Sequence, residues 1–306
     1  ALVGPSGSGK TTFSERLKIQ LIVCGKNPVT LPMDNYFLNR AQTPLDENGE
    51  YDYECLEALD LELLEADLEA GRPAPRRQEG VVVLAHDFLT DRHGLDHRLD
   101  RMAAAYREAG LATLAFDFSG QGESDDDVVT LSSETEDLQA VVGWLSLRGF
   151  RRIAIHANGF GATATLLARP DLVRTAVAVG AITGPQSILW DQVFSSVQLD
   201  ELERHGLTRL RDDNPNSRQW NLLSKETLAD VSLQTPERTM GDLPWPVLML
   251  HGALTDEFPD TADTAAAGFS LLPDGSQLVQ VHAGNVNEAQ EEVARLGVEW
   301  VQRRLR

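Results

Sequence analysis

Short apolar runs alternate with segments of helical periodicity from residue 81 to residue 303, and this alternation constrains the fold more than any other sequence feature. Six runs have the length and composition of buried strands: residues 81–85, 112–116, 153–155, 175–179, 247–250 and 278–281. Helical patterns separate most of these runs or follow the last one, at residues 99–109, 134–147, 163–168, 261–272 and 288–303. Strands that alternate with helices build a mostly parallel sheet covered on both faces. The sequence therefore predicts an α/β fold.

One long segment interrupts this alternation. Residues 182–245 are polar and rich in Asp, Asn, Gln and Trp. A segment of this length inside a regular α/β pattern is usually functional and often covers a site. We therefore expect a lid at residues 182–245, with a small-molecule ligand bound beneath it.

The chain is strongly acidic, with 47 Asp and Glu against 27 Lys and Arg among 306 residues, and its formal net charge is −20. Nucleic acids and anionic membranes carry charge of the same sign, so neither is an expected partner. No apolar run approaches the roughly 20 residues that a membrane-spanning helix needs. Two cysteines, Cys24 and Cys55, cannot form a disulfide framework, and the opening ALVGPSGSGK is not a signal-peptide pattern. These features favour a soluble protein of the cytoplasm.

The first residues match the phosphate-binding pattern G-x-x-x-x-G-K-[ST] at every position, between a strand-like and a helical segment. In such a loop the backbone N–H groups point into one concavity, and the following helix N-terminus favours anionic phosphates. The residues expected to hold the nucleotide are Gly4, Ser6, Gly7, Ser8, Gly9, Lys10 and Thr11. Lys10 would neutralise the β- and γ-phosphates, and the Thr11 hydroxyl would ligate Mg²⁺. We therefore expect ATP or another nucleoside triphosphate with Mg²⁺ as the ligand.

The segments GPSGSGKTTFSERL, PVTLPMDNYF, TPLDENGEYDYE and LEALDLELL resemble the uridine kinase/phosphoribulokinase family of P-loop kinases over about residues 1–70. The resemblance implies that Asp34 helps to activate an acceptor hydroxyl and that Asp52 lines the acceptor pocket. It also implies further strands and an arginine-bearing lid, yet nothing after Pro73 follows that pattern. We therefore expect a partial P-loop β-α-β unit at residues 1–72, fused through a linker at 73–79 to a domain at 80–306.

The rest of the chain carries the segments VVVLAHDF, LAFDFSGQGESD, RRIAIHANGFGATATLLA, PWPVLMLHGALTDEFP and EEVARLGVEWV, in that order. They resemble esterases of the α/β-hydrolase fold over residues 79–306. The resemblance implies that His86, Asp87 and Phe88 form the turn whose backbone N–H contributes to the oxyanion hole. In that family the middle residue is glycine, so Asp87 adds a carboxylate close to where negative charge would develop.

The same resemblance locates the catalytic positions, and they are not filled. The nucleophile elbow G-x-S-x-G corresponds to Ala-Asn-Gly-Phe-Gly, so Gly159 stands where the serine is needed. The acid position corresponds to Thr255, with Asp256 one place later, and His282 is the only histidine near the base position. The base position itself corresponds, depending on the alignment, to Gly284, Asn285 or Val286. Asp256 with His282 remains open as a displaced pair, but a serine hydrolase needs all three groups within hydrogen-bond reach.

The seven histidines show no paired ligand spacing with carboxylates, so the only metal expected is the Mg²⁺ held by Thr11 and the nucleotide. Three functions are therefore open. The first is nucleotide binding by a P-loop segment fused to a hydrolase-like domain without a nucleophile or base, with a binding or regulatory role. The second is an esterase-type hydrolase that is inactive because position 159 is glycine. The third is an ATP-dependent phosphotransferase like uridine kinase.

Overall fold

The computed structural model describes residues 80–187, 190–255 and 257–305, together with residues 17, 36, 38, 43–45, 49–52 and 55–61. The chain divides into two units, Ala1–Arg77 and Gln78–Arg306. The expected phosphate loop, Asp34 and Asp256 lie outside the described residues. Among the residues that are described, no helix is both long and apolar enough to cross a membrane.

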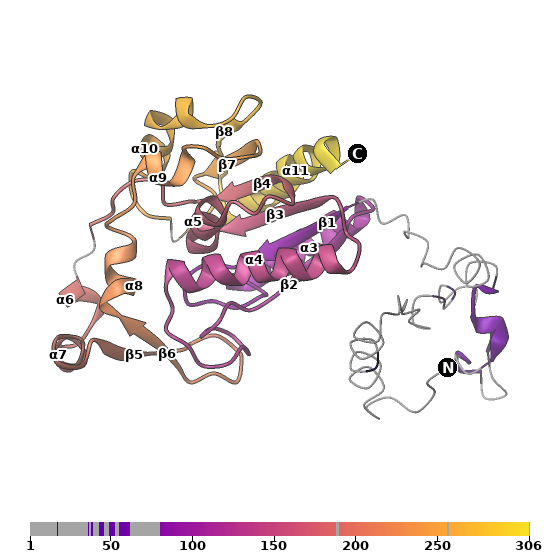
Figure 1. The fold of residues 1–306 in the computed structure, drawn as a ribbon, viewed down its shortest axis with the longest axis horizontal. Coiled ribbons are helices and arrows are strands. Elements are labelled where there is room, and N and C mark those ends of the chain that lie inside the picture. The colour runs from indigo at the N-terminus through magenta and orange to yellow at the C-terminus, as the bar shows by residue number, and fades with distance from the viewer. Residues whose placement is uncertain are drawn as a thin grey trace. The chain divides into compact units, whose positions relative to one another are not determined.

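The first unit has a short 3₁₀ helix η2 (Leu56–Ala58) among its described residues (Figure 1). Two backbone hydrogen bonds join this helix region to an earlier part of the unit: Leu38 N–H donates to Ala58 O over 2.8 Å, and Asp60 N–H donates to Tyr36 O over 2.6 Å. Tyr36 and Ala58 are both buried. These two hydrogen bonds therefore link residues 36–38 to residues 58–60 within the first unit.

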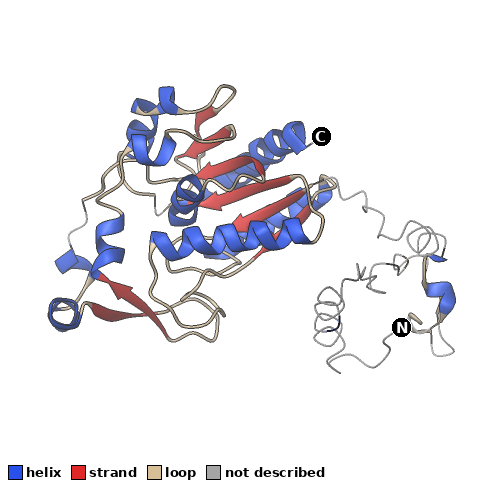
Figure 2. Ribbon diagram, in the orientation of Figure 1, coloured by secondary structure: helices blue, strands red, loops and turns tan. Residues whose placement is uncertain are grey.

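The second unit is built on a six-stranded sheet with the order β2-β1-β3-β4-β7-β8, in which every described pairing is parallel (Figure 2). The strands are β1 (Val81–Ala85), β2 (Ala112–Ala115), β3 (Ile153–Asn158), β4 (Val173–Val179), β7 (Val247–His251) and β8 (Gln277–Gln280). In β1, β3 and β7 every residue is buried, because central parallel strands have helices on both faces. The structure confirms the mostly parallel α/β sheet expected from the sequence.

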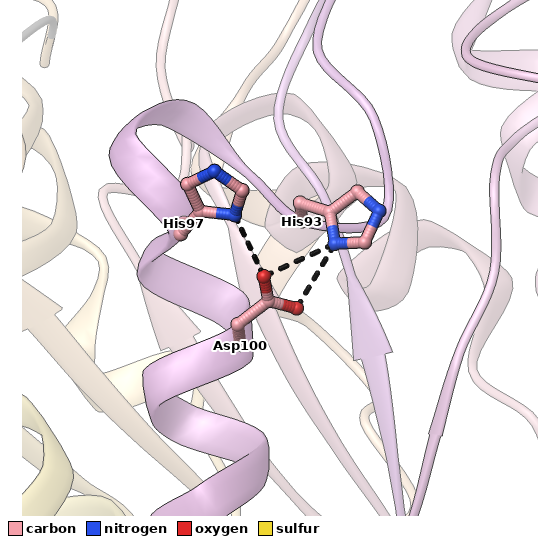
Figure 3. Close-up of side chains that lie close together, drawn as sticks. All are labelled: His93, His97 and Asp100. Carbon is pink, nitrogen blue, oxygen red and sulfur yellow. Dashed lines mark hydrogen bonds and ion pairs between the residues drawn. The ribbon is translucent and has the colours of Figure 1, made fainter. Parts of the chain in front are cut away.

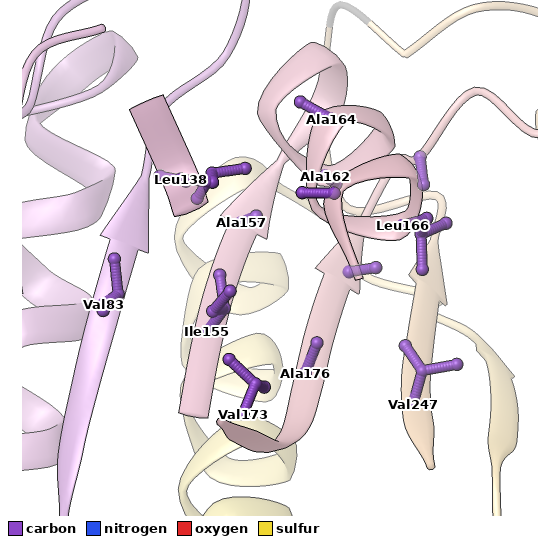
Figure 4. Packing of buried hydrophobic residues seen from close by; sticks show 14 of the residues in the cluster. Val83, Leu138, Ile155, Ala157, Ala162, Ala164, Leu166, Val173, Ala176 and Val247 are labelled. Carbon is purple, nitrogen blue, oxygen red and sulfur yellow. The ribbon is translucent and has the colours of Figure 1, made fainter. Parts of the chain in front are cut away.

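Helices cover both faces of this sheet (Figure 1). One face packs against α4 (Leu131–Leu147) and α5 (Gly159–Ala168), and the other against α3 (Arg98–Glu108) and α11 (Val286–Leu305). Figure 4 shows the first of these cores, where the strand residues Val83, Ile155, Ala176 and Val247 are register partners across four strands. Alternate strand residues point to opposite faces, so β1, β3, β4, β7 and β8 each contribute to both cores.

The segment expected to be a lid is folded. It contains α6 (Trp190–Val193), α7 (Ser196–His205), the antiparallel pair β5 (Leu207–Arg211) and β6 (Trp220–Ser224), α8 (Lys225–Asp230) and α9 (Pro236–Met240). Phe194, Leu202 and Leu223 form a small core of their own with Val129. The helix α10 (Thr261–Ala267) and the 3₁₀ helix η4 (Phe269–Leu271) follow β7.

The segment joins the loops that follow β1 and β2. Asn214 Nδ2 donates to Leu89 O over 2.7 Å, and Arg218 Nε donates to Gly122 O over 3.0 Å. In a parallel α/β sheet, ligands bind at the carboxyl ends of the strands, where these loops lie. The segment is therefore attached at the edge of the sheet where a site is expected.

Candidate functional site

The turn between β3 and α5 has the backbone of a nucleophile elbow. Gly159 follows the last residue of β3 directly and begins α5, and its φ is +50°. This left-handed conformation is strained for an L-residue, as it is for the serine of an elbow. The structure therefore keeps the strand-to-helix turn while Gly159 offers no nucleophile.

The carboxylate of Asp87 lies against this turn. Asp87 Oδ1 accepts hydrogen bonds from Phe88 N–H and from Phe160 N–H, each over 2.7 Å. In α/β-hydrolases the oxyanion hole is formed by the N–H of the residue after the nucleophile and an N–H from a loop after a neighbouring strand. Phe160 and Phe88 are the residues at those positions. In this chain both of these N–H groups already donate to the Asp87 carboxylate.

His86 fixes the turn that carries Asp87. Phe118 N–H donates to His86 Nε2 over 3.0 Å, so the ring proton is on Nδ1, which donates to Asp87 O over 2.8 Å. Burial lowers the pKa of His86, against the pull of the Asp87 carbonyl and neighbouring carboxylates. Thr90 Oγ1 donates to the same Asp87 carbonyl over 2.9 Å. His86 is therefore a neutral positioning residue with both nitrogens engaged.

A buried polar chain supports the same loop. Leu89 N–H donates to Gln121 Oε1 over 2.7 Å, and Gln121 Nε2 donates to Glu134 Oε1 over 2.9 Å. Glu134 is fully buried, and its Oε2 has no partner among the described residues. Burial raises the pKa of Glu134 well above its ordinary value, and the charge of Asp87 adds to the effect, although the Gln121 bond opposes it. Burial therefore favours the neutral acid form of Glu134, whose Oε1 holds Gln121 beneath the loop after β1.

The loop after β2 is tied to the loop after β1 by an ion pair. Asp117 accepts hydrogen bonds from Arg92 N–H over 2.6 Å, from Arg92 Nη1 over 2.5 Å and from Glu123 N–H over 3.0 Å. Partial burial raises the pKa of Asp117, but these hydrogen bonds outweigh it and bring the pKa below its ordinary value. Asp117 is thus an ionised group that positions these two loops.

The sequence did not identify Glu257, a carboxylate two residues after the expected acid position that pairs with a buried histidine. Glu257 Oε1 is 2.6 Å from His251 Nδ1, and Glu257 also accepts from Gly252 N–H over 2.8 Å and Thr261 Oγ1 over 3.0 Å. Burial raises the pKa of Glu257, but the His251 hydrogen bond and charge outweigh it and lower the pKa overall. His251 is fully buried, and its Nε2 has no partner within the described part of the chain. From the sequence alone, His251 and Glu257 are two polar residues on either side of one turn, and their pairing is not predictable.

The described residues give no contact between His282 and Asp256, the two residues expected to form a displaced pair. His282 is exposed and makes no hydrogen bond or ion pair with the described residues. Thr255, at the acid position itself, is exposed as well. Asp256 is outside the described residues, so its pairing with His282 stays a prediction.

Two cavities lie near the carboxyl ends of the strands. A small one of about 30 Å³ lies between β3, α3 and α11, and its lining includes Asn158, His156 and Arg98. Burial lowers the pKa of His156 to about 3, and its Nδ1 is 3.1 Å from Tyr106 Oη. A larger polar cleft of about 440 Å³ is bounded by residues 122–126 and 217–220. The larger cleft is the one to which the lid segment contributes.

No family model matches the chain. It is 39% identical over 66 residues to an uncharacterised 31.7 kDa protein of Escherichia coli from the traX–finO intergenic region, a match covering 21% of this chain and 22% of that protein. It is 31% identical over 67 residues to a uridine kinase of Leuconostoc citreum, covering 22% of this chain and 32% of the kinase. The chain therefore spans less than a third of the length of these curated relatives.

Solved structures match a much larger part of the chain. The α/β hydrolase GrgF from Penicillium aligns with a TM-score of 0.59 at 18% identity, over 76% of this chain and 92% of that one. A putative hydrolase from Agrobacterium vitis aligns with a TM-score of 0.55 at 19% identity, over 76% and 91%. A monoacylglycerol lipase from Paleococcus ferrophilus aligns with a TM-score of 0.56 at 16% identity, over 73% of this chain and 94% of the lipase.

The chain contains an α/β-hydrolase fold. Identities below a fifth show the fold alone, and the chemistry of this chain has to be argued from its own residues.

Proposed function

We propose that the α/β-hydrolase-fold unit is a binding domain that does not hydrolyse esters. The observation that supports this is the pair of hydrogen bonds from Phe88 N–H and Phe160 N–H to Asp87 Oδ1. An oxyanion hole stabilises charge that develops in the transition state, and a resident carboxylate has already used both donors. Gly159, moreover, offers no hydroxyl for attack.

The general base supports the same conclusion. A base must reach the nucleophile through a hydrogen bond. His86 is engaged at both nitrogens by Phe118 and by its own loop. His251 is bound to Glu257 at Nδ1 and is fully buried. The ligand of such a domain would be a small molecule bound near the lid segment, without a covalent step.

The experiment measures hydrolysis of p-nitrophenyl acetate and butyrate by the unaltered chain, together with labelling by a fluorophosphonate. We expect neither turnover nor labelling, with a commercial serine esterase as the positive control. Turnover by the unaltered chain that disappears in Asp87→Asn would overturn the proposal, because Asp87 would then be a catalytic residue.

The esterase alternative requires at least two replacements to be reversed together, in addition to a histidine at the empty base position. Serine at position 159 alone cannot form a working elbow while Asp87 occupies the hole. Ester hydrolysis gained by Gly159→Ser/Asp87→Gly, but by neither single variant, would favour an esterase scaffold that has lost its nucleophile. Because the base position is empty as well, the same variants are also made with Asn285→His. No gain in either background, with folding verified by circular dichroism, would favour the binding domain.

For the first unit we propose binding of a nucleoside triphosphate with Mg²⁺. The support is the complete phosphate-loop pattern that ends in Lys10 and Thr11. The test is calorimetric titration with Mg·ATP, comparing the unaltered chain with Lys10→Ala and, as a control outside the motif, Lys18→Ala. We expect binding to be lost only in Lys10→Ala. Binding that survives this change, or that is absent from the unaltered chain, contradicts the proposal.

Phosphoryl transfer remains the alternative for this unit. It predicts that Mg·ATP turnover depends on a hydroxyl acceptor such as a nucleoside and falls in Asp34→Asn. Nucleotide binding without acceptor-dependent turnover would favour a binding role instead.

A further inference from the structure

Two histidines and one aspartate converge where the loop after β1 enters α3. His93 Nδ1 lies 3.0 and 3.1 Å from the two carboxylate oxygens of Asp100, and His97 Nδ1 lies 2.8 Å from Asp100 Oδ2. Figure 3 shows both imidazole rings turned toward the carboxylate, His93 from the loop and His97 from the start of the helix. One ligand atom from each residue lies within 4.8 Å of the other two.

The backbone that carries this cluster is held in an uncommon shape. Asp96 and His97 have φ values of +53° and +57°, so two consecutive non-glycine residues adopt the left-handed conformation. Asp91 Oδ1 accepts a hydrogen bond from His93 N–H over 3.0 Å, and Asp91 is buried. The surrounding loop therefore fixes the positions of His93 and His97 relative to α3.

We propose that His93, His97 and Asp100 form a binding site for a divalent transition-metal ion of the zinc type. Imidazole nitrogen and carboxylate oxygen are ligands that Zn²⁺, Co²⁺ and Ni²⁺ accept, whereas Mg²⁺ and Ca²⁺ prefer all-oxygen sites. Two atoms that are each 2.0–2.1 Å from one ion lie about 3–3.4 Å apart. The separations between each histidine nitrogen and the Asp100 carboxylate, 2.8–3.1 Å, lie close to this range. The ligand atoms of His93 and His97 lie within 4.8 Å of each other and would move closer around the ion.

The three side chains of this cluster are exposed to solvent, so an ion can reach them. The side chains of His93, His97 and Asp100 are 43%, 65% and 47% exposed. Three protein ligands leave one or more coordination positions for water, and the bound ion would replace the protons that now form the hydrogen bonds to Asp100. The ion would link the loop after β1 to the first turn of α3.

This site corrects the expectation that no histidine is paired with a carboxylate at ligand spacing. The sequence His93-x₃-His97-x₂-Asp100 does carry such a spacing. The sequence pattern alone does not indicate this ligand set, because a spacing of four residues aligns two side chains only within a helix, and His93 precedes α3. The left-handed residues at 96 and 97 are what bring the rings together.

The experiment is titration of the full chain, free of nucleotide, with Co²⁺ followed by visible d–d absorption, and then displacement by Zn²⁺. We expect one saturable Co²⁺ site and full displacement by one equivalent of Zn²⁺. The variants His93→Gln, His97→Gln and Asp100→Asn should each weaken Co²⁺ binding at least tenfold. The exposed histidines His205 and His282 supply matched controls, and their Gln variants should bind as the unaltered chain does.

Circular dichroism of each variant separates loss of a ligand from loss of folding. Three results would overturn the assignment: no saturable absorption at millimolar Co²⁺, unchanged affinity in all three ligand variants, or an equal loss in the controls. Neither ester hydrolysis nor nucleotide binding enters these readouts, so the metal site stands or falls independently of the proposed functions.

Discussion

Asp87 and Gly159 are complementary in space: an ideal Cβ placed on Gly159 would lie 2.0 Å from Asp87 Oδ1 and 2.1 Å from its Cγ. No side chain at position 159 can coexist with this carboxylate unless one of the two moves. The residues at 159 and 87 are therefore coupled in packing, because the Asp87 carboxylate fills the volume that a side chain at position 159 would need.

Gly159→Ser is expected to destabilise the second unit by about 1–3 kcal/mol, because it overpacks the turn and places a side chain at a positive φ. Adding Asp87→Gly should recover part of the loss, so the two changes will be non-additive. All five tryptophans lie after residue 77, so urea unfolding followed by tryptophan fluorescence reports on this unit. Gly143→Ser is the control, since a Cβ there meets nothing within 4 Å. Additive effects would contradict the complementarity.

Asp87→Ala should destabilise the same unit by about 1–3 kcal/mol, because Phe88 N–H and Phe160 N–H lose their acceptor. Asp87→Asn keeps an oxygen in that place and should cost clearly less. The measurement is again the urea midpoint, with the exposed Asp125→Ala as the control. Equal losses in the Ala and Asn variants would show that the charge of Asp87, rather than its acceptor oxygen, is what the turn requires.

Much of the sheet was predictable from the sequence, because its strands are buried and apolar. β1 coincides with the expected run at residues 81–85. β3, in contrast, was expected to end at Ile155 and extends to Asn158, because the polar residues His156 and Asn158 are buried in the sheet. The pattern of apolar residues predicts only those strand positions that carry apolar side chains. It does not predict a strand position at which a polar side chain is buried.

The contacts of the site were less predictable, because they join residues far apart in the chain. The resemblance implies that Asp87 adds a carboxylate close to where negative charge would develop, but the hydrogen bond from Phe160 N–H depends on how two strands are placed. The helix expected at residues 261–272 also divides at Gly268, where an added Cβ would meet Pro236 at 2.7 Å. Both features are set by packing between elements rather than by local periodicity.

His156 should make the second unit less stable in acid. Burial lowers its folded-state pKa to about 3, whereas the ordinary value is 6.5. Between these values the unfolded chain binds a proton that the folded chain does not, so stability falls as pH falls from 6.5 toward 3. His156→Gln removes this titrating group and should flatten the fall in the urea midpoint over that range. The exposed His205→Gln should leave the profile unchanged, and a flattening there would argue against His156 as the source.

Glu134 should make the second unit less stable as the pH rises. Its folded-state pKa is raised well above 4.5 by burial, so its contribution is fully present below pH 4.5 and is lost as pH rises toward the folded value. Glu134→Gln keeps the oxygen that accepts from Gln121 Nε2 and has no proton to lose, so it should unfold at a higher urea midpoint than the unaltered chain at pH 8. Glu134→Ala leaves Gln121 unpaired and should be less stable at every pH. A Gln variant that loses stability at pH 8 would mean that the ionised form of Glu134 is the one the fold accommodates.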